Sequence, residues 1–65
     1  MSIDEFLSFF PKKGTGAVSK SEVRKKTENL SDYDFQSLFR RCVFNSLLKQ
    51  ETGQFPSMIL FVRAS

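Results

Sequence analysis

Hydrophobic residues recur at helical spacing near the start of the chain. They occupy positions i, i+3, i+4 and i+7, namely Ile3, Phe6, Leu7 and Phe10. This spacing places side chains on one face of an α-helix. Because proline disrupts a helix interior, the pattern predicts a helix that begins at Ser2 and is ended by Pro11.

A longer hydrophobic stripe lies in the middle of the chain. It consists of Phe35, Leu38, Phe39, Cys42 and Val43. The spacing i, i+3, i+4, i+7, i+8 predicts a core-facing helix that ends near Asn45 and Ser46, since asparagine tolerates the left-handed conformation. Cys42 is therefore expected to be buried as a small hydrophobic residue.

A short polar segment from Ser19 to about Glu28 separates these stripes and is predicted to be a second helix, with Val23 and Thr27 facing inward. All three predicted helices begin with a serine followed three residues later by an acid, as in a capping box. The pairs are Ser2 and Glu5, Ser19 and Glu22, and Ser31 and Asp34. Flanking hydrophobic residues can form staples, in the pairs Met1 and Phe6, Val18 and Val23, and Leu30 and Phe35. Only Asn29, Leu30 and Ser31 separate the second and third predicted helices. A link of this length is typical of a helix-turn-helix.

The last third of the chain predicts a β-hairpin. Leu47 to Lys49 leads into a polar loop over residues 50–54, and Ser57 to Arg63 is rich in residues that favour strands. Pro56 stands at the strand entrance, where its missing N–H does least harm. Gly16 to Val18 is a candidate third strand.

The order helix, short strand, helix, tight turn, helix, hairpin resembles the winged helix-turn-helix domains. The resemblance extends from Ser2 to Arg63. The segment Val18-Ser19-Lys20-Ser21-Glu22-Val23 resembles the opening of the family's second helix, and Phe35 to Leu48 resembles its recognition helix running into the first wing strand. The resemblance implies an α+β fold. It also implies that residues 1–65 form a single winged-helix domain with three helices and a C-terminal β-hairpin wing. In that family the third helix commonly enters the DNA major groove.

Composition narrows the chemistry. The chain has eight phenylalanines, one cysteine and no histidine, so its core must come from hydrophobic packing, with neither an internal disulfide nor a zinc site of mixed Cys and His ligands. Cys42 lacks the usual base for a nucleophile, and Asp32 and Asp34 diverge on a helix. We therefore expect no enzyme activity, no cofactor, no metal and no small-molecule substrate. Nothing resembles a targeting or membrane segment, so we expect a cytoplasmic protein without a membrane partner.

Charge favours a nucleic-acid partner. The formal net charge is +3, and residues 11–26 hold six basic residues and one acid. This basic cluster is either a phosphate-contacting face or a solvated surface that maintains solubility. It comprises Lys12, Lys13, Lys20, Arg24, Lys25 and Lys26.

Two functions follow from these features. The first is a transcriptional or accessory regulator that contacts duplex DNA through the third helix, the second helix and the wing. The expected DNA-binding residues are Lys20, Arg24, Lys25, Gln36, Ser37, Arg40, Arg41 and Asn45. The carboxylates of Asp32 and Asp34 would repel phosphates at the start of the third helix.

The alternative is a protein-interaction module on the same fold that binds no DNA, acting as an adaptor, an inhibitor or a homodimer. Its candidate interface residues are Tyr33, Phe44 and Phe55, unless the hairpin folds back and covers them.

Overall fold

A computed structural model describes residues 1–52 and 59–64, and within them serines begin all three helices. The helices are α1 (Ile3–Leu7), α2 (Lys20–Lys26) and α3 (Asp32–Phe44). The capping pairs are Ser2 with Glu5, Ser19 with Glu22 and Ser31 with Asp34, with serine Oγ accepting the backbone N–H at 3.2, 3.2 and 3.1 Å. The predicted helix starts are confirmed. In the described residues no carboxylate returns a bond to a capping serine, so only half of each capping box forms.

The helix ends differ from the prediction. α1 ends at Leu7, well before Pro11, because Ser8 donates its hydroxyl proton to the Glu5 carbonyl and the chain tightens into a turn. α2 ends at Lys26 and not at Glu28. After α3, the left-handed residue is Ser46, with φ of 58°, and not Asn45, whose φ is −89°.

The sheet is three-stranded and antiparallel. Its strands β1 (Val18–Ser19), β2 (Leu48–Thr52) and β3 (Ile59–Arg63) lie in the order β1-β3-β2. Phe61 pairs with Val18 on one side and Gln50 on the other. Two predictions were wrong in detail, since the short first strand begins at Val18, not Gly16, and Gln50 belongs to a strand, not a loop.

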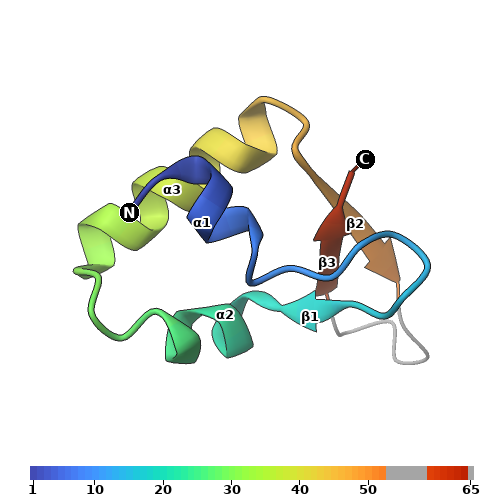
Figure 1. Ribbon diagram of the computed structural model, residues 1–65, viewed down its shortest axis with the longest axis horizontal. Helices are drawn as coiled ribbons and strands as arrows, with labels where there is room; N and C mark the ends of the chain where they lie inside the picture. Colours follow the sequence, from blue (N-terminus) through green and yellow to red (C-terminus); the bar gives the residue numbers. More distant parts are fainter. Residues whose placement is uncertain (53–58, 65) are drawn as a thin grey trace.

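The hairpin is confirmed as a β2–β3 pair. The predicted positions of Gly53, Pro56 and the first residues of the return strand lie outside the described residues. Figure 1 shows the helices gathered towards one end of the molecule and β2 and β3 at the other, with β1 leading directly into α2. The fold is thus α+β, with α3 running from α2 towards the sheet.

Phenylalanine rings join these elements into one core. Phe6 lies 5.6 Å, centroid to centroid, from Phe10 and also from Phe35, and Phe39 lies 5.0 Å from Phe61 of β3. Cys42 is fully buried, as predicted. Val43 is a correction, because it was assigned to the core stripe and is 46% exposed. It projects about 100° around the helix from Cys42, which carries it past the edge of the buried face.

The predicted hydrophobic staples form in part. Val18 and Leu30 pack against the core beside Val23 and Phe35, whereas Met1 is exposed. No helix in residues 1–52 and 59–64 has the length and hydrophobicity needed to cross a bilayer.

Candidate interaction surface

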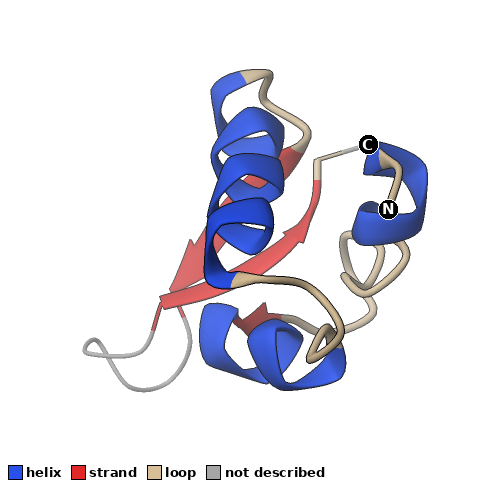
Figure 2. Cartoon of the chain, turned by 90° about the vertical axis from the view of Figure 1, so that its left-hand side faces the viewer, coloured by secondary structure: helices blue, strands red, loops and turns tan. Residues whose placement is uncertain are grey.

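The outward face of α3 carries four exposed side chains: Tyr33, Ser37, Arg40 and Phe44. Their spacing of i, i+4, i+7 and i+11 sets them on one face of the helix, opposite the buried Phe35. We call these four residues the outward stripe. In Figure 2, α2 lies below the N-terminal end of α3 and the β2–β3 hairpin passes beside it. The stripe is therefore held on a helix that packs against both.

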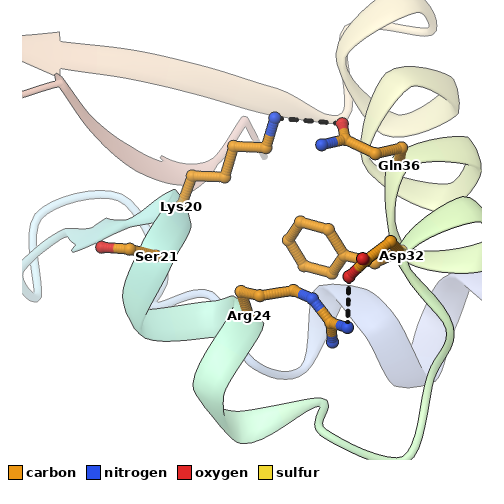
Figure 3. A pocket seen from close by; sticks show the side chains of 6 residues that line it. Lys20, Ser21, Arg24, Asp32 and Gln36 are labelled. Carbon is orange, nitrogen blue, oxygen red and sulfur yellow. Dashed lines mark hydrogen bonds and ion pairs between the residues drawn. The ribbon is translucent and has the colours of Figure 1, made fainter.

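Polar side chains connect α2 to the N-terminal half of α3 (Figure 3). Lys20 Nζ donates to Gln36 Oε1 at 3.0 Å and lies 4.7 Å from the centroid of the Phe39 ring. The guanidinium of Arg24 bonds Asp32 Oδ1 at 2.8 Å. These two bridges lie at either end of the space between the helices, and they fix how α2 and α3 sit relative to each other.

Arg24 also organises the turn between the helices. Its Nη1 donates to the Thr27 carbonyl at 2.8 Å and its Nη2 to the Leu30 carbonyl at 3.1 Å. The guanidinium lies 5.3 Å from the centroid of the buried Phe35 ring. Arg24, expected on the outer surface, is therefore only partly exposed and closes the helix-turn-helix.

The two acids at the start of α3 flank the outward stripe. Asp32 is ion-paired with Arg24, although its side chain is 93% exposed. Asp34 lines a hollow with Met1, Arg41 and Ser37, a residue of the stripe. Arg24 therefore offsets the charge of Asp32, whereas the Asp34 carboxylate lies beside the stripe.

The structure divides the basic cluster between several directions. Lys20 and Arg24 stand one turn apart and face α3, whereas Lys25 and Lys26 are exposed and project about 100° apart. Lys12 and Lys13 are exposed in the loop that follows α1. Within the basic cluster, only Lys20 and Arg24 therefore lie beside Gln36 of α3 in the described residues.

The adjacent arginines of α3 point to different sides. Arg40 lines a hollow with Phe44, and Arg41 lines the hollow that contains Asp34. Asn45 donates its side-chain N–H to the Arg41 carbonyl at 2.9 Å, so its amide caps the end of the helix. Arg40 therefore borders the hollow beside Phe44, whereas Arg41 lines one hollow with Ser37 and Asp34.

Exposed hydrophobic residues gather at the C-terminal end of α3. Phe44 is 86% exposed and Val43 46%, and Tyr33, at the other end of the helix, is 80% exposed. The hypothesis that the hairpin covers Tyr33 and Phe44 was wrong, because both are exposed and Phe61 of β3 packs against Phe39 on the buried side of α3. Phe55 lies outside the described residues. Val43 was missed as a surface residue because the periodicity assigned it to the core.

The chain matches no protein-family model, no curated protein and no solved structure. Among the described residues, no group of three or more His, Cys, Asp or Glu side chains is arranged to hold a metal ion.

Proposed function

We propose that the chain is a winged-helix protein that binds duplex DNA, with α3 as the recognition helix and the β2–β3 hairpin as the wing. The element order α1-β1-α2-α3-β2-β3 supports this fold, as does a hairpin that directly follows the third helix. In domains of this kind an exposed helix enters the major groove, whose width accommodates an α-helix.

The observation that carries the proposal is the outward stripe of α3. Ser37 and Arg40 are exposed at its centre, and the nearby Asp32 carboxylate is paired with Arg24. Arginine can bind guanine edges or phosphates, and serine can bond base edges or phosphates. The stripe thus presents polar donors to DNA, with the Asp34 carboxylate at its edge beside Ser37.

The other residues expected at DNA take supporting roles. The Lys20–Gln36 bond and the Arg24 bridge hold α2 against α3. In this proposal Lys25 and the remaining donors of Lys20 contact phosphates. Arg41 and Asn45 lie at the edge of this surface.

The test is binding to a random-sequence duplex, measured by fluorescence anisotropy at a low and a near-physiological salt concentration. We expect affinity to fall steeply with salt, with a log–log slope near −0.9 per phosphate contact. Arg40→Ala and Lys25→Ala should each weaken binding and reduce the slope by about one contact.

Lys26→Ala is the matched control, since it removes the same charge from the same helix at a position that points away from Lys25. It should leave the slope nearly unchanged. Absence of binding at low salt, or equal effects of Lys25→Ala and Lys26→Ala, would rule out this face.

Protein binding is the second candidate function, favoured by the exposure of Tyr33 and Phe44 on α3. Exposed aromatic residues often anchor protein interfaces. Sedimentation at several protein concentrations tests the homodimer version, and a strict monomer removes it.

A further inference from the structure

Two hollows adjoin at the C-terminal half of α3 and together form an apolar trough. The first, of about 350 Å³, lies between α3 and Lys20 and is lined by Gln36, Phe39, Arg40, Val43 and Phe44. The second, of about 410 Å³, lies between α3 and the sheet and is lined by Phe39, Val43, Leu48, Gln50 and Phe61. Phe39 and Val43 line both, so the two hollows adjoin at these side chains.

The charges at this trough have one sign. Lys20 and Arg40 line it, and no carboxylate of the described residues does. Glu51 follows Gln50 on β2, and since successive strand residues point to opposite faces of a sheet, it is directed away from the trough. Only one of the three donors of Lys20 is used by Gln36, and no bond involves the Arg40 side chain within residues 1–52 and 59–64.

We infer that this trough binds an acidic segment of another protein, with a hydrophobic anchor seated against Phe44 and Val43 and carboxylates paired with Arg40 and Lys20. Carboxylate pairing with arginine gives both strength and geometry, and the apolar floor supplies contact area that the sugar–phosphate surface of DNA does not offer.

Charge also favours a foreign partner over a second copy of this chain. The chain has a net charge of +3, and a symmetric dimer through the trough would bring the two Arg40 side chains and the two Lys20 side chains to one interface. Like charges at an interface oppose association. An acidic segment meets no such repulsion. This inference is independent of DNA binding, although Arg40 takes part in both surfaces.

The experiment selects short random peptides, displayed on phage, against the whole chain. We expect the recovered sequences to combine Asp or Glu with an aromatic or aliphatic anchor. A synthetic copy of one recovered peptide is then titrated by anisotropy into wild-type and variant chains. Phe44→Ser and Arg40→Glu should each weaken binding by about tenfold or more.

Ile59→Ser is the matched control, because Ile59 of β3 is also an exposed hydrophobic residue, at 54%, and lines neither hollow. It should leave the peptide affinity unchanged, and circular dichroism checks that each variant folds. Recovery of neutral or basic peptides, recovery of no sequence family, or an equal loss in Ile59→Ser would overturn the inference.

Sedimentation of the wild-type chain tests whether a second copy of the chain occupies the trough instead. A concentration-dependent dimer that Phe44→Ser abolishes would assign the trough to a second copy and also overturn the inference. A chain that binds the acidic peptides but not DNA would contradict only the proposed function, so the two failures are distinguishable.

Discussion

The N-terminal half of α3 is bound to α2 through polar side chains, whereas its C-terminal half leaves hydrophobic side chains in contact with solvent. In the first half, Asp32 and Gln36 each bond a basic residue of α2. In the second half, Val43 and Phe44 stand beside a trough whose floor is Phe39. Both halves bury the same inner stripe, so the difference lies on the sides of the helix.

The two halves of α3 therefore differ in role: the polar contacts of the first half stabilise the fold, and the exposed hydrophobic residues of the second half are left uncovered. Charged groups at the α2–α3 junction are paired with one another and with backbone carbonyls, which stabilises one geometry. A large exposed hydrophobic residue next to an apolar hollow contributes little to the fold of the isolated chain and is typical of binding surfaces. The first half of α3 therefore holds the helices together, and the second half carries the binding site that we propose.

The largest expected loss of stability is for a substitution on the inner face of α3, opposite the outward stripe. Phe35 is 2% exposed, and its ring contacts those of Phe6 and Phe39. Phe35→Ala should lower the free energy of unfolding by about 3–5 kcal/mol, which is enough to unfold so small a domain. Circular dichroism and a thermal melt measure this loss.

Phe44→Ala makes the same substitution at an 86% exposed position of the same helix. It should change the free energy of unfolding by no more than about 0.5 kcal/mol. A comparable loss in both variants would mean that the C-terminal half of α3 is covered, and the comparison would fail.

The next largest loss of stability is expected for a substitution of Arg24, which tests whether this residue stabilises the α2–α3 junction. Arg24→Ala removes the Asp32 ion pair and the bonds to the Thr27 and Leu30 carbonyls. Because the ion pair is largely exposed, most of the loss should come from the two carbonyls, and we expect about 1–2 kcal/mol in urea unfolding.

Lys25→Ala is the control for Arg24→Ala, since Lys25 is the next residue of α2 and is exposed. It should be nearly neutral. Asp32→Asn should cost less than Arg24→Ala, because the carbonyl bonds remain. Equal losses in Asp32→Asn and Arg24→Ala would mean that the ion pair alone stabilises the junction.

The sequence predicted the local features of this fold. Serine caps and hydrophobic spacing depend on residues within one or two turns, so the starts of all three helices, the burial of Cys42 and the β2–β3 hairpin could be read directly. The helix ends were less accurate because they depend on side-chain bonds, such as the one from Ser8 to the Glu5 carbonyl, that compete with the helix.

The site was harder to predict because its bonds join residues far apart in the chain. Lys20 and Gln36 are separated by 16 positions, and each alone resembles an ordinary surface residue. Treating the basic cluster as one face missed that Lys20 and Arg24 turn inwards to α3. The exposure of Val43 depends on where β2 and β3 end against α3, which periodicity does not specify.

The smallest expected effect concerns the inner side of the C-terminal half of α3, where Cys42 is fully buried one position from the exposed Val43. Burial raises the pKa of the Cys42 thiol above its ordinary value of 9.0, against a smaller lowering by Arg41. The unfolded chain therefore loses this proton first as pH rises. The thiol contributes stability that is fully present below pH 9.0 and is lost as pH rises through the higher folded value.

Urea unfolding at a series of alkaline pH values, compared between the wild-type chain and Cys42→Ala, isolates this contribution, because the two chains differ only at the thiol. The free energy of unfolding of the wild-type chain should fall more steeply above pH 9.0 than that of Cys42→Ala. Parallel curves would mean that solvent reaches Cys42 in the folded chain. The C-terminal half of α3 would then be open on its inner side as well, and the trough beside Phe44 would lack the rigid floor that a binding site requires.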